Sequence, residues 1–276
     1  MRRTAAERRN LTTKFPWARS LISVAARYSS DRPDVGIARH IARYAQGDDY
    51  HDVLDRPLEE LETFIRSAIN PNTGQPAKTR RYIDTGPILE KLYAAETGIG
   101  WLGKNTLVLN ERLGSYLFLG EIITDLALPA DPPATERCGT CTRCLDACPT
   151  NAFVAPYVLD ATRCISYHTI ESREPIPPDI TARLEGNFFG CDICQEVCPW
   201  NREAVGAAPT RPEFETRPAY RTTSVEDMAS MSVEAFRKMF RSSPLKRPGL
   251  EKLKGTVSLI ADHPVDQAST KGPAEE

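Results

Sequence analysis

The spacing of apolar residues predicts a strand and then a long helical segment near the start of the chain. Residues 20–28 form a short apolar run that is typical of a buried strand. From residue 35 to about residue 69, apolar residues recur at roughly helical spacing, with Gly47 and Pro57 as interruptions. We therefore expect a strand that is followed by a helical region in the first quarter of the protein.

Further elements follow a turn cluster at residues 70–74. The pattern predicts a strand over residues 81–84 and a helix over residues 87–96, which has proline in its first turn. Two apolar runs at residues 106–109 and 116–124 are typical of strands. This alternation of strand, helix and strand predicts an α/β or α+β domain.

A proline-rich segment at residues 129–133 separates this domain from the rest of the chain. All the cysteines lie beyond it, and a segment rich in proline and charge follows from about residue 208, with one amphipathic helix near residues 233–240. We expect three units: an α/β domain over residues 1–128, a cysteine module over residues 129–205, and a helical or irregular segment over residues 206–276.

The cysteines carry the strongest chemical signal in the chain. All eight lie between Cys138 and Cys198, and the first four follow the spacing C-x2-C-x2-C-x3-C-P. In bacterial ferredoxins this run gives three thiolates to one 4Fe-4S cluster and the fourth thiolate to another cluster. The pattern therefore predicts a ferredoxin-like module that holds two 4Fe-4S clusters.

The second block of cysteines is incomplete. Its run C-x2-C-x3-C-P begins at Cys191, and Phe188 stands where a further thiolate is expected. Cys164 is the cysteine that remains to fill this place. We name the two resulting groups the first ligand set, which is Cys138, Cys141, Cys144 and Cys198, and the second ligand set, which is Cys148, Cys164, Cys191 and Cys194.

Two zinc sites with four cysteines each are the alternative, because closely spaced cysteine pairs are also zinc ligands. Zinc gives no reason for four cysteines at x2-x2-x3 spacing, or for the proline after the last cysteine of both blocks. Disulfides are disfavoured because we expect no export signal, and cytosolic thiols stay reduced. Iron-sulfur clusters are the favoured interpretation.

Charge and hydropathy restrict the partners and the location. The net charge is −2, so any contact with nucleic acid has to be local. Paired arginines near the N-terminus are not followed by an apolar stretch, and no segment approaches the roughly 18 apolar residues of a membrane span. We expect a cytoplasmic protein with no membrane contact.

Residues 98–105 (GIGWLGKN) contain the pattern G-x-G-x-x-G, but their context does not fit a dinucleotide site. Such a site has a strand before the glycines and a helix after them, whereas here the predicted helix comes first. Asn105 also stands where a phosphate loop needs serine or threonine. We instead expect a tight turn whose backbone approaches another large cofactor.

Asp84 lies where a predicted strand ends and a predicted helix begins. Ligands bind at this edge of open α/β sheets, but an aspartate there also commonly caps the helix. Position alone favours the cap. Two histidines are weaker candidates: we expect His51 to be a helix-end residue, and His168 is a candidate hydrogen-bonding group near the clusters.

Several strings together resemble one family, the epoxyqueuosine reductases. The resemblance covers roughly residues 16–250. Members of that family usually start earlier, so the first domain is expected to be short at its N-terminus. The strings are residues 42–45 (ARYA), 49–51 (DYH), 82–87 (YIDTGP), 98–106 (GIGWLGKNT), 118–121 (FLGE), 164–167 (CISY) and 191–201 (CDICQEVCPWN).

The resemblance implies a cobalamin between the α/β domain and the cluster module, and the reduction of epoxyqueuosine in tRNA, the last step of queuosine biosynthesis. It implies that Asp84 donates a proton and that Asn105, Val108, Ser166 and Asp192 contact the corrin. Turning an epoxide into an alkene needs two electrons and a proton source, and a carboxyl group serves as that source when burial raises its pKa. We therefore expect a dry pocket around Asp84 when substrate is bound.

The expected partners are tRNA carrying epoxyqueuosine and an electron donor such as a flavodoxin or ferredoxin system, which act on a monomer. Lys246, Arg247, Lys252 and Lys254 form a basic cluster that is a candidate contact for tRNA phosphates, with a solvated tail as the alternative. Two other functions stay open: a corrinoid reductive dehalogenase or related small-molecule reductase, and a two-cluster electron carrier. A carrier leaves the upstream domain unexplained.

Overall fold

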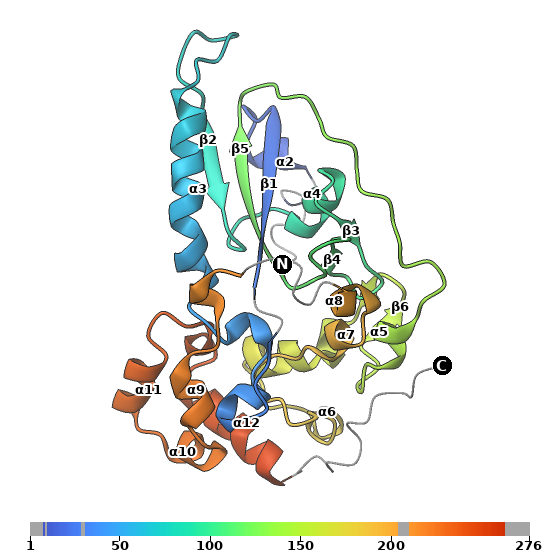
Figure 1. The fold of residues 1–276 in the computed structure, drawn as a ribbon, viewed down its shortest axis with the longest axis vertical. Coiled ribbons are helices and arrows are strands. Elements are labelled where there is room, and N and C mark those ends of the chain that lie inside the picture. Colours follow the sequence, from blue (N-terminus) through green and yellow to red (C-terminus); the bar gives the residue numbers. More distant parts are fainter. Residues whose placement is uncertain (1–7, 9, 29–30, 204–209, 263–276) are drawn as a thin grey trace.

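The computed structural model describes residue 8 and residues 10–28, 31–203 and 210–262. A small sheet with helices on its faces is followed by the cysteine module and by a group of short helices that ends in α12 (Figure 1). Within these ranges, no helix combines the length and the apolar character that crossing a membrane requires.

The sheet has three strands in the order β1-β5-β2, and both pairs are antiparallel. β1 (Ser20–Arg27) and β5 (Leu117–Thr124) confirm the predicted strands, whereas β2 (Thr79–Tyr82) lies about two residues earlier than expected. β2 ends there because Asp84 has a φ of 55°, which is far from an extended conformation. The expected mixture of helices and strands is present, with an antiparallel sheet at its centre.

Successive side chains of β5 point to opposite faces of the sheet. Phe118 packs with apolar residues of α3 (Tyr50–Ser67) on one face. Ile123 packs on the other face, in a cluster that includes Tyr93 of α4 (Glu90–Glu96). Two helices of different length therefore cover the two faces.

The prediction of a single helical region from residue 35 to about residue 69 is wrong for its first third. Two 3-10 turns, η2 (Gly36–His40) and η3 (Arg43–Ala45), precede α3. A Cβ atom on Gly47 would lie 2.4 Å from the carbonyl oxygen of Glu213, so the chain passes too close to another segment to form a helix there. Asp49 then caps α3 by accepting a hydrogen bond from the next turn.

The glycine-rich string forms a hairpin. α4 precedes it, as predicted, although this helix begins at Glu90 and not at residue 87. β3 (Trp101–Leu102) and β4 (Val108–Leu109) pair with each other. A Cβ atom on Gly100 would lie 2.1 Å from the carbonyl oxygen of Leu109. This glycine therefore permits close pairing within the hairpin, and the expectation that the turn approaches a large cofactor stays a prediction.

The helical part has a core that joins distant parts of the chain. Ile37 and Ile41 are fully buried together with Phe188, Phe189 and Leu253. The predicted helix near residues 233–240 is confirmed as α11. The remaining elements are α2 (Leu11–Lys14), α5 (Arg143–Asp146), β6 (Phe153–Ala155), β7 (Val158–Leu159), η4 (Ala161–Arg163), the π-helix η5 (Tyr167–Glu171), α6 (Pro178–Thr181), α7 (Ile193–Glu196), α8 (Pro199–Glu203), η6 (Pro212–Phe214), α9 (Pro218–Thr222), α10 (Val225–Ser230), α11 (Val233–Met239), η7 (Pro244–Lys246) and α12 (Leu250–Asp262).

Candidate functional site

Two cavities divide the eight cysteines. The central cavity, of about 420 Å³, lies between the sheet and the cysteine module, and Tyr28, Phe118 and all four members of the second ligand set line it. The distal cavity, of about 250 Å³, is lined by all four members of the first ligand set. The fold therefore groups the cysteines into the same two sets of four that their spacing predicts.

The thiols of each set lie close enough to affect one another. The pKa of Cys144 is raised to about 11, by burial and then by the other three thiols of the first set. The pKa of Cys194 is raised by burial and then by Cys191 and Cys164. Four crowded thiolates between apolar walls need a cationic centre, which the iron atoms of a cluster provide.

The β3–β4 hairpin contacts the residues that surround the distal cavity. The Nζ atom of Lys104 donates hydrogen bonds to the carbonyl oxygens of Gly139 (2.6 Å) and Cys141 (2.9 Å). Trp101 packs edge to face against Trp200, with ring centres 5.0 Å apart, and both belong to a cluster with Cys138 and Cys198. The sheet domain therefore fixes the loop that carries three of the first four cysteines.

Asp84 lies in the loop between β2 and α4, at the edge of the central cavity. It is exposed, and it does not cap α4, whose N-cap residue is Leu89. Its carboxylate accepts a hydrogen bond of 2.9 Å from the hydroxyl of Tyr50. The capping role that position alone favours is therefore wrong. The dry pocket expected around Asp84 concerns the substrate-bound state and stays a prediction.

A third cavity, of about 400 Å³, adjoins the central cavity and shares Tyr44, Tyr50 and Asp84 with it. We call it the outer compartment. Lys246 and Arg247 also line it. Asp84 therefore stands at the junction between a space walled by cysteines and a space with basic residues at its rim.

Aromatic stacking orders the wall between these two spaces. The ring of Tyr50 lies 4.5 Å from that of Phe118, with 8° between the planes, and 4.1 Å from that of His51. His51 is in the first turn of α3, as expected, and its Nδ1 atom lies 2.8 Å from Asp49. This hydrogen bond with Asp49 raises the pKa of His51. Burial, followed by Asp84, raises the pKa of Tyr50, so its hydroxyl keeps its proton.

Three of the four predicted corrin contacts line the central cavity: Asn105, Ser166 and Asp192. Asn105 is 3% exposed, and its side-chain amide lies 3.5 Å from the carbonyl oxygen of Cys194. Val108 is buried within β4 and does not line this cavity, although its neighbour Leu107 does.

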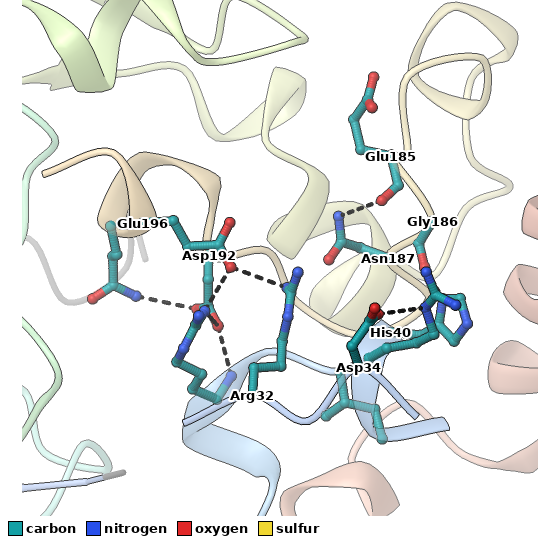
Figure 2. A network of polar contacts seen from close by, with 12 residues as sticks. Arg32, Asp34, His40, Glu185, Gly186, Asn187, Asp192 and Glu196 are labelled. Carbon is teal, nitrogen blue, oxygen red and sulfur yellow. Dashed lines mark hydrogen bonds and ion pairs between the residues drawn. The ribbon is translucent and has the colours of Figure 1, made fainter. Parts of the chain in front are cut away.

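Asp192 joins the cysteine module to the segment before α3 (Figure 2). It is 1% exposed, and its Oδ2 atom accepts hydrogen bonds from the backbone N–H of Arg43 (2.7 Å) and from the Arg43 guanidinium (3.2 Å). The guanidinium also lies 2.6 Å from Glu196, which pairs with Arg32 at 3.3 Å. The loop between Cys191 and Cys194 is therefore held by the pair between the buried carboxylate of Asp192 and the partly buried guanidinium of Arg43.

Other polar candidates have less direct roles. The Nε2 atom of His168 lies 2.7 Å from the carbonyl oxygen of Thr162, and its Nδ1 atom has no partner within the described residues. In the basic cluster, Arg247 pairs with Glu171 at 2.7 Å. Lys252 donates to a backbone oxygen, so only part of the predicted cluster faces the outer compartment.

Sequence reasoning did not identify several residues that line the site or hold it together. Tyr50, Lys91 and Glu90 line the central cavity, and Arg43 anchors the loop of the second ligand set. Tyr50 and Arg43 occur in the strings that resemble the family, and this was the available signal. Nothing in the spacing of apolar residues distinguishes Glu90 or Lys91 from other charged residues of a helix.

Two family models match the chain, one over the cysteine module and one over the domain that precedes it. Residues 137–201 match the model "4Fe-4S double cluster binding domain". The cysteine module is therefore a double 4Fe-4S domain, and the zinc and disulfide alternatives are wrong. Residues 8–85 match the model "Epoxyqueuosine reductase QueG, DUF1730".

Curated relatives extend the match over most of the chain. An epoxyqueuosine reductase from Synechocystis is 42% identical over 245 residues, which is 87% of this chain and 82% of that protein. The chain belongs to the epoxyqueuosine reductase family. Another family member, from Cellulophaga algicola, is 38% identical over 88% of this chain and 77% of its own length. One from Pseudomonas aeruginosa is 44% identical, but the match spans 57% of its length.

Solved structures of epoxyqueuosine reductases have the same fold. One, in complex with an epoxyqueuosine-modified stem loop of tyrosine tRNA, matches with a TM-score of 0.82 and 31% identity, over 91% of this chain and 66% of that chain. A Bacillus subtilis structure, whose catalytic aspartate loop is swung out of the active site, matches with a TM-score of 0.84 and 30% identity, over 94% of this chain and 68% of that chain. The mixed α/β architecture is therefore that of the family.

Proposed function

We propose that this protein reduces epoxyqueuosine to queuosine in the anticodon loop of tRNA, with cobalamin that is reduced through the 4Fe-4S clusters. The observation that carries this proposal is the position of Asp84 between the central cavity and the outer compartment. An acid at this junction lies between a source of electrons and a space for the substrate.

Cobalamin, when bound, supplies a strongly reducing cobalt centre next to the substrate. The residues that would hold it are Asn105, Ser166 and Asp192, which line the central cavity with the second ligand set. The cavity wall combines apolar and aromatic side chains with these few polar groups, which is a composition typical of cofactor sites. Val108 would contribute only through the backbone and packing of the β3–β4 hairpin.

Asp84 would donate a proton to the epoxide oxygen as the carbon–oxygen bonds break. Conversion of an epoxide to an alkene consumes two electrons and two protons and releases one water molecule. Tyr50 orients the Asp84 carboxyl through its hydrogen bond, and the bound nucleoside would exclude water from the junction. Desolvation would then favour the protonated form of the acid.

The outer compartment would receive the modified base. Bases in a single-stranded anticodon loop can enter a pocket and stack on aromatic side chains, and Tyr44, Tyr50 and His51 offer such surfaces. Lys246 and Arg247 at the rim would contact tRNA phosphates. The tRNA therefore needs only a local basic surface on a protein whose net charge is −2.

The distal cavity would receive electrons from a flavodoxin or ferredoxin system. Lys104, Arg137 and Arg143 line it, and such carriers are acidic, so the charges are complementary. We propose that the protein acts as a monomer in the cytoplasm, where its tRNA substrate and a low-potential donor are both present.

The test is the anaerobic reduction of an epoxyqueuosine-containing tRNA stem loop by the purified protein with cobalamin and a chemical reductant. Mass spectrometry of the nucleosides should show queuosine in place of epoxyqueuosine. A protein that binds cobalamin but converts only a halogenated or other small substrate would be the dehalogenase-like reductase. If the protein did not bind cobalt, the two-cluster electron carrier would be the remaining hypothesis.

A further inference from the structure

An unusual glutamate lies on the face of the sheet that α4 covers. Glu121 on β5 stands opposite Ser23 on β1, and 0% of its surface is exposed. Neither of its carboxyl oxygens has a partner in good hydrogen-bond geometry within the described part of the chain, and the polar side chains that act on it are those of Glu90 and Ser23. Buried carboxyl groups nearly always have such partners, so this residue needs an explanation.

Glu90 is the charged residue with the strongest effect on Glu121. It begins α4, its Oε1 atom is also buried with no partner among the described residues, and it lines the central cavity with Asp84. Burial, followed by Glu90, raises the pKa of Glu121, and burial, followed by Asp84, raises the pKa of Glu90. Two carboxyl groups that repel each other in a buried place retain at least one proton.

Burial outweighs the effect of the groups that favour the charged form of this pair. The backbone of Asp84 and the side chain of Arg8 lower the pKa of Glu90, and the hydroxyl of Ser23 lowers that of Glu121, but burial has the larger effect on both. Lys91, the next residue of α4, lines the same wall of the central cavity. The pair therefore holds at least one proton close to Asp84.

We propose that Glu90 and Glu121 form a proton relay that recharges Asp84 during the reaction proposed above, on which this inference rests. The reaction consumes two protons, whereas the Asp84 carboxyl holds one. The proton that the pair retains moves from the Glu121 carboxyl to the Glu90 carboxylate and from Glu90 to the Asp84 carboxylate, so that one O–H bond forms for each one that breaks. The clusters supply the two electrons, and water in the central cavity reprotonates the pair between turnovers.

The test compares the wild-type protein with the variants Glu90→Gln and Glu121→Gln, all with both clusters, on the stem loop with cobalamin and reductant. At pH 7 each variant should lose about tenfold or more in kcat, while KM stays within about twofold. As the pH rises, the wild-type pair loses its protons, so the wild-type kcat should fall towards that of the variants. A purely structural role would lower kcat by the same factor at every pH.

Glu62→Gln is the matched control. Glu62 is 2% exposed, but it lies on α3 and pairs with Arg66 and Arg81. Its substitution removes a buried carboxylate without touching the pair, so the shape of the pH profile should not change. Wild-type kcat in both relay variants at pH 7, or a loss that is independent of pH, would overturn the relay.

A spectroscopic readout separates the relay from the proposed function. The infrared spectrum of the wild-type protein at pH 8 should contain the carbonyl band of a protonated carboxyl. This band should be absent from the spectrum of Glu121→Gln, so it should appear in the difference between the two spectra. Absence of this band from the wild-type protein overturns the relay, whatever the activity. A protein that shows the band and leaves epoxyqueuosine intact overturns the proposed function, not the protonated pair.

Discussion

The hydroxyl of Tyr50 donates a hydrogen bond of 2.9 Å to the Oδ2 atom of Asp84. This bond connects the first turn of α3 to the loop between β2 and α4. Tyr50 is itself fixed by its stacking on Phe118. The orientation of the proposed proton donor is therefore set by a rigid aromatic residue that is not a cluster ligand.

Tyr50→Phe should lower kcat by up to about tenfold, since a hydrogen bond to the neutral carboxyl that donates the proton contributes about 0.5–1.5 kcal/mol. The phenyl ring can keep the stacking on Phe118, so KM for the stem loop and the affinity for cobalamin should not change. Steady-state kinetics and a cobalamin titration measure these quantities. Tyr93→Phe, on the α4 face of the sheet, is the control, and an equal loss of kcat there would exclude a specific role for Tyr50.

Asp84→Asn should abolish turnover, with a loss in kcat of about 100-fold or more, because an amide cannot supply the proton. The side chain is exposed and similar in size, so iron content and cobalamin binding should be retained. Single-turnover assays with excess enzyme measure the chemical step. Asp52→Asn in the first turn of α3 is the matched control. Full activity of Asp84→Asn would remove Asp84 from the mechanism.

Cys164→Ser should remove the cluster next to the central cavity and leave the other, because Cys164 belongs to the second ligand set. Iron content should fall by about half relative to the double-cluster domain. Turnover with a chemical reductant should be lost. Cys141→Ser should also halve the iron but retain part of this turnover, since its cluster is the distal one. Full iron content in Cys164→Ser would refute the assignment.

Arg43→Met should destabilise the protein by about 3–5 kcal/mol, because it leaves the buried carboxylate of Asp192 without its cationic partner. Arg39→Met is the control: the Arg39–Asp34 pair is exposed, so its loss should cost less than about 1 kcal/mol. Anaerobic denaturant unfolding of the proteins with both clusters gives the free energies. Equal effects of the two substitutions would contradict the role assigned to Asp192.

The pair of His51 and Asp49 should make stability depend on pH. The folded pKa of His51 is raised by Asp49, so the contribution of its protonated form is fully present below the unfolded value of about 6.5 and is lost as the pH rises through the folded value. The folded pKa of Asp49 is lowered, so its contribution is present above its unfolded value and is lost in acid. The stability difference between the wild-type protein and His51→Gln, from denaturant unfolding, should therefore shrink between pH 6 and pH 8.5. A difference that is constant over this range would contradict the pairing.

The cysteine sets could be predicted from the sequence because the spacing of cluster ligands is a local property of the chain. Phe188 in place of a cysteine was enough to assign Cys164 to the second set. The strands β1 and β5 could be predicted equally well, since continuous apolar runs specify buried strands. The family strings made Asp84 a candidate proton donor, whereas position alone would have assigned it to a helix cap.

Other features depend on contacts between distant segments, which periodicity cannot express. The helical pattern before Gly47 fails because the backbone of Glu213 lies against that glycine. The antiparallel pairing of β2 with β5 could not be predicted, because it depends on the β3–β4 hairpin that lies between these two strands in the chain. The proximity of Glu90 to Glu121 depends on the same kind of contact: Glu121 ends one of the strings that resemble the family, but nothing in the sequence connects it to Glu90.

Asn105 lines both the central and the distal cavity, whereas Asp84 lines both the central cavity and the outer compartment. The three spaces therefore form a series, with the central cavity between the other two. In the proposed function, a carrier protein docked at one end would leave the other end free, so a bound tRNA would remain seated while single electrons arrive in succession. Donor and tRNA should not compete in inhibition kinetics, and no half-reduced nucleoside needs to be released.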